Sequence, residues 1–150
     1  MKFTITTPEQ MEVFGGDLAK VLQAGDVVLL EGNLGAGKTT LTRGIGAELG
    51  ASGTVQSPTF VLARTHKTKA GPKLVHVDAY RLGSAIELDD LDIDYERSIV
   101  VMEWPRDFVD GVVDQYLKVK IDRGRQDDVR EVEVTLVGQR WQGVKIAFSN

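Results

Sequence analysis

Residues 32–39 have the composition and spacing of a loop that binds phosphate. They read Gly-Asn-Leu-Gly-Ala-Gly-Lys-Thr, which is one glycine, four free positions and then Gly-Lys-Thr. Such a loop binds a polyphosphate through backbone N–H groups, a lysine and the positive end of a helix dipole. The flanking residues fit, because 26–31 are an apolar run of strand length and 39–49 read as a helix that Gly50 ends. The stretch therefore predicts a nucleoside triphosphate site.

Individual residues of this loop have separate predicted roles. Gly35 and Gly37 let the backbone approach a ligand where a Cβ atom would intrude. Lys38 places a positive charge at the β- and γ-phosphates, and we expect its side chain to face solvent. Thr39 offers its hydroxyl to Mg²⁺, which holds the same phosphates from the other side. The competing interpretation is a tight turn between a strand and a helix, with Lys38 solvated.

A second chemical feature is Glu103, which ends the apolar run 98–103. In enzymes with a phosphate-binding loop, an apolar strand beside the loop's own strand ends in an acidic residue. That residue reaches the Mg²⁺ ligands or the attacking water. Acidic residues at strand ends are common, so Glu103 alone decides nothing. Together with the loop at 32–39 it favours a role in metal binding or hydrolysis.

Length and composition limit the classes of protein to consider. At 150 residues the chain suits one domain, and without cysteine it has neither disulfides nor thiolate metal sites. No apolar run approaches the roughly 20 residues that span a bilayer, and the N-terminus lacks the apolar core of a signal peptide. We therefore expect a cytoplasmic protein without a membrane partner. Acidic residues outnumber basic ones by 22 to 18, which argues against direct binding of DNA or RNA.

The remaining patterns predict the elements that position the loop and the carboxylate. Thr7, Pro8 and Gln10 are a helix-start signature, and apolar residues then share one face of a helix that ends before Gly25. Spacing leaves open whether the polar start of this helix lies near a nucleotide. Further strands are predicted at 2–6, 59–66, 73–78, 115–122 and 130–137, with one or two short helices within 86–95.

Together these elements predict a single α/β P-loop NTPase domain over residues 1–150, with a central mixed β-sheet flanked by helices. Strands 26–31 and 98–103 are expected at its centre. The hairpin formed by 59–66 and 73–78 and the two strands of the tail extend the sheet. Residues 141–150 show no assignable pattern.

Three groups of charged residues each have two interpretations. Arg123, Arg125 and Arg130 lie in or beside the turn between the tail strands, either as solvated arginines or as cations near phosphate. The acidic run 89–94 is either a solvated surface or a surface for a partner or metal. Four basic residues flank the predicted hairpin, either as a solvated tip or as a local basic patch: Arg64, Lys67, Lys69 and Lys73.

Missing signatures narrow the class of nucleotide-binding protein. The sequence contains neither Asn-Lys-x-Asp nor Asp-x-x-Gly, the strings of a GTPase, which favours ATP. It also lacks the Leu-Ser-Gly-Gly-Gln signature of transporters, and the chain is short for a ring ATPase with a helical lid. A small-molecule kinase would need an acceptor pocket and a lid with several arginines. A nucleotide-gated binding module with negligible hydrolysis stays open as an alternative.

Four motifs occur in the order and spacing of one family. They are Gly-Asn-Leu-Gly-Ala-Gly-Lys-Thr-Thr at 32–40, Ser-Pro-Thr-Phe at 57–60, His-Val-Asp-Ala-Tyr-Arg-Leu at 76–82 and Glu-Trp-Pro at 103–105. Over nearly its whole length the chain resembles TsaE, the bacterial ATPase family needed for threonylcarbamoyladenosine modification of tRNA. The loop alone is generic, whereas the four motifs together are specific.

The resemblance implies an ATPase that requires Mg²⁺ and acts with TsaB and TsaD, which carry the threonylcarbamoyl group to adenosine 37 of tRNA. TsaE itself does not transfer that group, and any contact with tRNA comes through the complex. Because no arginine finger is obvious, we expect slow hydrolysis by the isolated chain.

Site residues follow from the resemblance position by position. Lys38, Asp78 and Glu103 would be catalytic, and Thr39 and Glu103 would hold Mg²⁺. Trp104 would lie beside the site. Asn33 stands where many members carry Asp, and it is not expected to touch phosphate itself. The resemblance implies a phosphate cradle at residues 35–40, and the full set of residues that we expect at the nucleotide is Asn33, Leu34, Gly35, Ala36, Gly37, Lys38, Thr39, Thr40 and Arg130.

Overall fold

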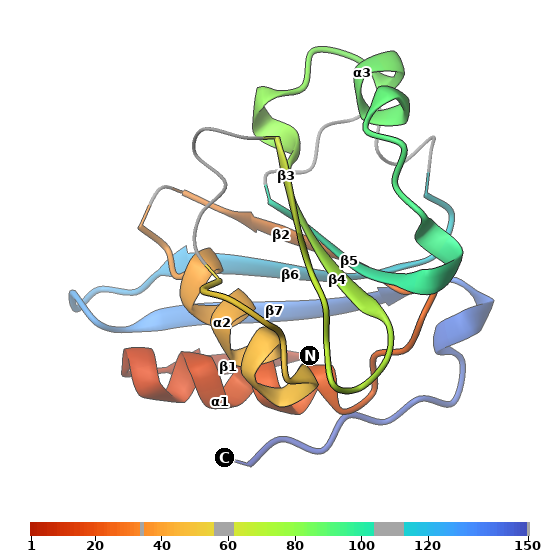
Figure 1. The fold of residues 1–150 in the computed structure, drawn as a ribbon. Coiled ribbons are helices and arrows are strands. Elements are labelled where there is room, and N and C mark those ends of the chain that lie inside the picture. The colour runs from red at the N-terminus through yellow and green to blue at the C-terminus, as the bar shows by residue number, and fades with distance from the viewer. Residues whose placement is uncertain (34, 56–61, 104–112, 150) are drawn as a thin grey trace.

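The computed structural model describes residues 1–33, 35–55, 62–103 and 113–149, which form one sheet with helices packed against it (Figure 1). The strands are β1 (Lys2–Ile5), β2 (Val27–Gly32), β3 (Ala63–His66), β4 (Lys73–Asp78), β5 (Ser98–Glu103), β6 (Tyr116–Arg123) and β7 (Arg130–Val137). The α-helices are α1 (Pro8–Ala19), α2 (Lys38–Leu49) and α3 (Ala85–Asp90). Short 3-10 helices cover Ala79–Arg81, Tyr95–Arg97 and Gln139–Trp141.

The sheet has the strand order β1-β7-β6-β2-β5-β4-β3. Strands β6, β2, β5 and β4 run parallel, and the pairs β1–β7, β7–β6 and β4–β3 are antiparallel. The predicted α/β class with a central mixed sheet is confirmed, and β2 and β5 lie at its centre as expected. Because the four parallel strands end at the same edge, side chains from distant parts of the chain meet there.

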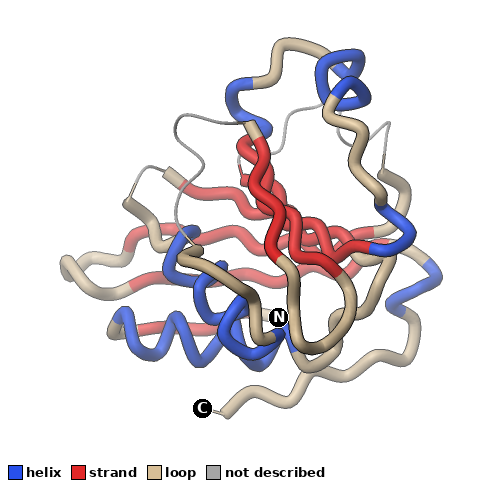
Figure 2. The backbone as a smooth tube through the Cα atoms, viewed as in Figure 1, coloured by secondary structure: helices blue, strands red, loops and turns tan. Residues whose placement is uncertain are grey.

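The two faces of the sheet are covered by different parts of the chain (Figure 2). Val28 and Leu30 belong to a core that includes residues of α1 and α2, whereas Val27 and Leu29 belong to a second core with Leu88 of α3. This alternation is the period of a strand that is buried on both faces. Residues along one strand therefore point either toward α2 and the loop before it or toward the segment around α3.

Helix α1 begins where the sequence predicts and ends earlier. The Thr7 hydroxyl accepts a hydrogen bond from the Gln10 amide at 3.1 Å, and the Gln10 side chain accepts one from the Thr6 amide at 2.9 Å. The helix ends at Ala19, and the next turn carries Leu22, whose amide bonds to the Ala19 carbonyl at 3.1 Å. Leu22 is nevertheless buried, so its apolar character reflects core packing beyond the helix end.

Two glycines bring the backbones of α1 and α2 into direct contact. A Cβ atom on Gly15 would collide with the Leu41 carbonyl oxygen, and one on Gly44 would collide with the Glu12 carbonyl oxygen. This close packing fixes the start of α1 against the loop that precedes α2. The start of α1 therefore becomes part of the wall around the candidate site.

The hairpin is confirmed for 63–66 with 73–78, while its residues 59–61 lie outside the described ranges. The tail strands are confirmed within one residue at each end. The C-terminal residues that showed no pattern pack on α1, since the Phe148 and Phe14 rings stack with centroids 4.9 Å apart. No helix within the described ranges is both long and apolar enough to cross a membrane.

Candidate functional site

The loop between β2 and α2 has a backbone that glycine adopts readily and other residues do not. Gly35 has a φ of 78° and Gly37 a φ of 116°, both in the left-handed region. A Cβ atom on Gly32 would lie 2.9 Å from the carbonyl oxygen of Ile121 on β6. Helix α2 starts at Lys38, and its N-cap is Gly37, which has no side chain to bond the first helix amides. The loop therefore leaves those amides to a ligand in front of it.

Lys38 is buried, so the prediction that its side chain faces solvent is wrong. The residue is 6% exposed, and its Nζ donates a hydrogen bond to the Gly32 carbonyl oxygen at 2.6 Å. The ammonium group turns back onto the start of its own loop, which explains the burial. Burial lowers the pKa of Lys38 to about 8, while the carboxylates of Glu103 and Asp78 act in the opposite direction.

Asp78 and Glu103 end neighbouring parallel strands at the same level. Glu103 has one direct partner in each neighbouring strand. These partners are Asp78 in the β4–β5 register and Leu30 in the β2–β5 register. Glu103 is 4% exposed, and its Oε1 atom is buried without a hydrogen bond to any described residue. The structure therefore brings Lys38, Asp78 and Glu103, the three predicted catalytic residues, to one edge of the sheet. Their mutual electrostatic influence follows from this placement.

The two predicted Mg²⁺ ligands are a hydroxyl and a carboxylate. Thr39 lies in the first turn of α2, and Glu103 lies at the end of β5. Among the described residues there is no group of three or more His, Cys, Asp and Glu side chains that would hold a metal alone. Mg²⁺ is often held by one or two carboxylates together with water and phosphate oxygens of a substrate. A buried carboxylate at the end of the strand next to the loop's own strand fits that mode, so the residues fit a cation that arrives with a nucleotide.

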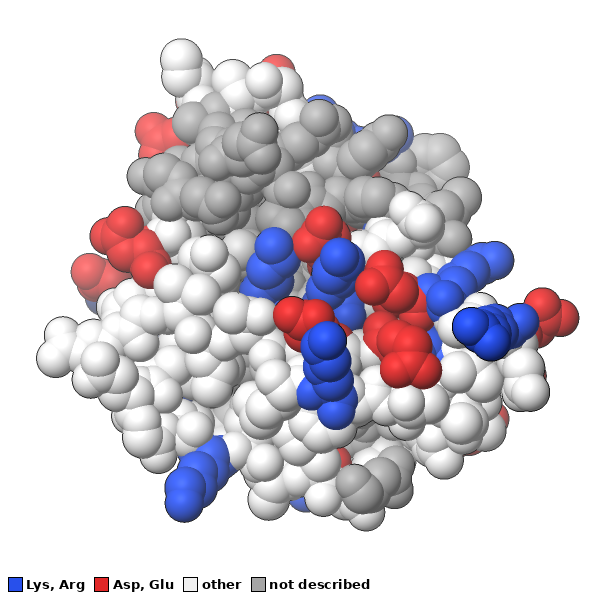
Figure 3. Space-filling model, turned by 180° about the vertical axis from the view of Figure 1, so that it is seen from behind, with Lys and Arg blue, Asp and Glu red and all other residues white. Residues whose placement is uncertain are grey.

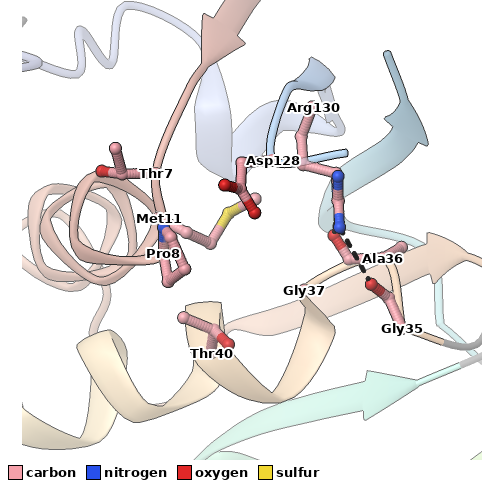
Figure 4. A pocket seen from close by; sticks show the side chains of 9 residues that line it. All are labelled: Thr7, Pro8, Met11, Gly35, Ala36, Gly37, Thr40, Asp128 and Arg130. Carbon is pink, nitrogen blue, oxygen red and sulfur yellow. Dashed lines mark hydrogen bonds between the residues drawn. The ribbon is translucent and has the colours of Figure 1, made fainter. Parts of the chain in front are cut away.

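Arg130 contacts the loop from the β6–β7 hairpin (Figure 4). Its Nε donates to the Ala36 carbonyl oxygen at 2.9 Å and its Nη2 to the Gly35 carbonyl oxygen at 3.3 Å. Arg123 is its partner in the β6–β7 register, and a Cβ atom on Gly35 would lie 2.5 Å from Nη2 of Arg123. Both arginines therefore reach the loop, whereas Arg125 is exposed in the turn. The guanidinium of Arg130 holds loop carbonyls, a role that the sequence did not indicate.

A cavity of about 190 Å³ lies beside the loop, between the start of α1 and the β6–β7 turn (Figure 4). Its lining residues are Thr7, Pro8, Met11, Gly35, Ala36, Gly37, Thr40, Asp128 and Arg130. The loop residues, Thr40 and Arg130 were expected here. The sequence left open whether the start of α1 lies near a nucleotide, and it did not indicate a role for Asp128. Only the packing of α1 on α2 and the register of the β6–β7 hairpin would have placed these residues at the loop.

Leu34, the stretch 57–60 and Trp104 lie outside the described residues. Asn33 is exposed at the end of β2.

Comparison with known proteins identifies the family to which this chain belongs. Residues 5–132 match the family described as threonylcarbamoyl adenosine biosynthesis protein TsaE. The chain belongs to the TsaE family. The predicted resemblance is thus confirmed.

Individual relatives agree with the family match. The chain is 51% identical over 138 residues to the tRNA threonylcarbamoyladenosine biosynthesis protein TsaE of Streptomyces coelicolor, covering 87% of this chain and 93% of the relative. It is 34% identical over 145 residues to the protein of the same name from Bacillus subtilis, covering 95% and 89%. The crystal structure of Bacillus subtilis YdiB superimposes with a TM-score of 0.77 at 31% identity, covering 95% of this chain and 88% of that one.

Proposed function

We propose that this TsaE-family protein binds ATP with Mg²⁺ at the loop between β2 and α2 and hydrolyses it in support of threonylcarbamoyladenosine formation on tRNA. The observation that carries the proposal is the meeting of Lys38, Asp78 and Glu103 beside a loop with uncapped helix amides. A cation, carboxylates and an amide cradle are the parts that phosphoryl transfer requires. The process comes from the relatives, whose names specify tRNA threonylcarbamoyladenosine biosynthesis.

The triphosphate would lie on the loop amides and the first turn of α2, with the adenosine in the adjoining cavity. The cavity shares residues 35–37 with the loop, which makes it continuous with the phosphate position. Met11 supplies an apolar wall, and Asp128 and Thr40 supply polar groups. Lys38 already bonds to the Gly32 carbonyl oxygen at the start of the loop, and its ammonium group, which carries three N–H donors, would also donate to phosphate oxygens.

Thr39 and Glu103 are the residues that would hold Mg²⁺, whose contribution is to neutralise charge on the phosphates. Asp78 lies directly beside Glu103 in the next strand. From there its carboxylate can accept a hydrogen bond from a water molecule and orient it toward the terminal phosphate. Lys38 stabilises the negative charge that develops on the phosphate oxygens.

Hydrolysis by the isolated chain is expected to be slow. Arg130 donates its hydrogen bonds to loop carbonyls, so it shapes the loop and does not neutralise charge on the terminal phosphate. In other enzymes with a phosphate-binding loop, an arginine at that phosphate is worth about 10³ to 10⁵ in rate. We therefore propose that TsaB and TsaD are the partners that raise the rate.

A single-turnover experiment tests the function. Labelled ATP and excess protein are mixed with Mg²⁺, with and without TsaB and TsaD, and free phosphate is followed. Slow release by the chain alone and faster release with the partners supports the ATPase. Binding without release in both conditions would instead support a nucleotide-gated module.

Contact with tRNA is proposed to come through the complex. Figure 3 shows Lys and Arg side chains interspersed with Asp and Glu on one face of the molecule, and not gathered into a patch of one sign. Lys118 of β6 and Glu31 of β2 form an ion pair at 3.2 Å. Such a face gives little attraction for a phosphate backbone. Neither DNA nor a membrane is part of the proposal, which locates the protein in the cytoplasm.

A further inference from the structure

His76 is a fully buried histidine that the proposed mechanism leaves without a role. It lies in β4, two residues before Asp78, and its exposed fraction is 0%. Its Nε2 atom lies 3.1 Å from Oε1 of Glu103, which is itself 4% exposed. The two side chains are therefore in direct contact beneath the surface of the candidate site.

The strand register explains this contact. Val101 is the partner of His76 in β5, and Asp78 is the partner of Glu103. Leu74 and Val101 belong to the core that includes residues of α1 and α2, so alternation along the strands places His76 and Glu103 on the same face. His76 thus lies on the face toward α2 and the loop, one step deeper than the carboxylates.

The contact is close but is not yet a hydrogen bond. Although the distance is short, the alignment fails, and both ring nitrogens of His76 and Oε1 of Glu103 lack a hydrogen bond to any described residue. Buried polar groups are rarely left in this condition, because each one loses its bonds to water. A hydrogen bond between the two side chains would satisfy one ring nitrogen of His76 and Oε1 of Glu103 together.

We propose that His76 is a positioning residue that donates its Nε2–H to the Glu103 carboxylate and thereby fixes the other oxygen for the metal. The inference rests on the proposed Mg²⁺-nucleotide site. Carboxylates that bind metals are themselves held by hydrogen bonds, and loss of such a partner typically lowers metal affinity by about 10- to 100-fold. A neutral imidazole suffices for this role, because only its N–H is used.

The test compares side chains that differ in where they carry a donor. His76→Gln can place an amide N–H near the position of Nε2, whereas His76→Asn places it one bond short and His76→Leu removes it. His66→Leu is the matched control, because His66 is also buried but bonds to the Ser52 carbonyl oxygen through Nδ1 at 2.8 Å. Each variant is titrated with Mg²⁺ at fixed ATP, with binding measured by calorimetry, and again with ATP in the presence of a chelator.

We expect His76→Leu and His76→Asn to raise the Mg²⁺ concentration for half-maximal ATP binding by about 10-fold or more. His76→Gln should stay close to wild type, His66→Leu should leave the requirement unchanged, and binding without Mg²⁺ should be equal in all variants. If the Leu variant does not fold, the Gln and Asn pair decides the matter.

Two results would overturn the inference alone: an unchanged Mg²⁺ requirement in His76→Asn and His76→Leu, or equal loss in His76→Gln and His76→Asn. Wild-type protein that binds ATP without any dependence on Mg²⁺ would overturn the inference together with the metal part of the proposed function. Wild-type protein that binds no ATP at all would remove the proposed function itself. The wild-type titration therefore separates the two failures.

Discussion

The two sides of the candidate site differ in how well their polar groups are satisfied. On the loop side, the Lys38 ammonium bonds to the Gly32 carbonyl oxygen, and Arg130 bonds to the carbonyl oxygens of Ala36 and Gly35. On the strand side, Oε1 of Glu103 is buried 3.1 Å from Nε2 of His76 and has no hydrogen bond to a residue that the structure describes. The chain itself therefore supplies the hydrogen bonds of the loop side, whereas the strand side holds a buried carboxylate, which is a group that binds cations.

This difference assigns separate tasks to the two sides. A phosphate on the loop side would meet a lysine that the loop itself already positions, so its binding would depend on the charge of Lys38 and on the shape of the loop. A cation on the strand side would bind the buried carboxylate of Glu103 through the oxygen that does not face His76. Changes on the loop side should therefore alter nucleotide affinity, and changes on the strand side should alter metal dependence and hydrolysis.

Removing the loop-side cation should have the largest effect. Lys38→Ala is expected to weaken ATP binding by about 100-fold or more, because the phosphates lose a desolvated charge partner. Since Lys38 is buried, thermal unfolding must confirm that the variant is folded. Lys120→Ala, which removes an exposed lysine from β6, is the control and should bind ATP like wild type. Full ATP affinity in folded Lys38→Ala would contradict the loop-side assignment.

Glu103→Gln should act on the strand side and spare the loop side. The substitution keeps the shape of the side chain and removes its charge. Hydrolysis should fall by about 100-fold, while ATP affinity without Mg²⁺ should change by less than about threefold. Glu133→Gln on the exposed part of β7 serves as the control, and phosphate release and calorimetry provide the measurements. Equal losses of binding and hydrolysis would assign Glu103 to structure.

Arg130→Leu should reveal how much the shape of the loop contributes to binding. It removes the hydrogen bonds to the carbonyl oxygens of Gly35 and Ala36. ATP affinity should fall by about 10-fold, in line with the loss of charged hydrogen bonds. Arg125→Leu removes an exposed arginine from the same hairpin and should leave affinity unchanged. If both variants bind equally well, the contact of Arg130 with the loop is dispensable.

The smallest expected effect is a dependence of ATP affinity on pH. Burial lowers the pKa of Lys38 to about 8 against the opposing carboxylates of Glu103 and Asp78. Bound phosphate favours the protonated lysine, so binding above about pH 8 must take up a proton, and affinity should fall there by less than about tenfold per pH unit. Calorimetry in buffers of different ionisation enthalpy measures this uptake. A flat affinity up to about pH 9.5 would show that Lys38 stays charged in the free protein.

The stability of the free protein should respond to pH in the opposite direction. Between about 8 and the ordinary value of 10.5, the unfolded chain keeps the Lys38 proton that the folded chain has lost. The unfolded state then binds more protons, so the contribution of Lys38 to the free energy of unfolding rises with pH across this interval. Denaturant unfolding of wild type and Lys38→Ala across the interval isolates that contribution.

Local patterns predicted much of the fold and part of the site. The spacing of Gly32, Gly37 and Lys38 was sufficient for the loop, and the left-handed φ of Gly37 is a requirement of the local backbone. The start of α1 followed from Thr7 and Gln10, whose hydrogen bonds are also local.

Long-range packing explains what the sequence did not predict. Arg130 and Ala36 are 94 positions apart, and only the β6–β7 register brings the guanidinium to the loop. The burial of Lys38 depends on the fold of the loop onto itself, which residue type does not reveal. Similarly, the contact of His76 with Glu103 requires β4 and β5 to be neighbours in parallel.

Calorimetric titration of wild-type protein with ATP, in the presence of Mg²⁺ and again with a chelator, tests the central claim most directly. The claim is that the loop side binds the phosphates while the strand side takes the cation. It predicts a single ATP site whose affinity is higher with Mg²⁺, with the Mg²⁺ gain lost in Glu103→Gln. Equal ATP affinity with and without Mg²⁺, or a Mg²⁺ gain that persists in Glu103→Gln, would contradict it.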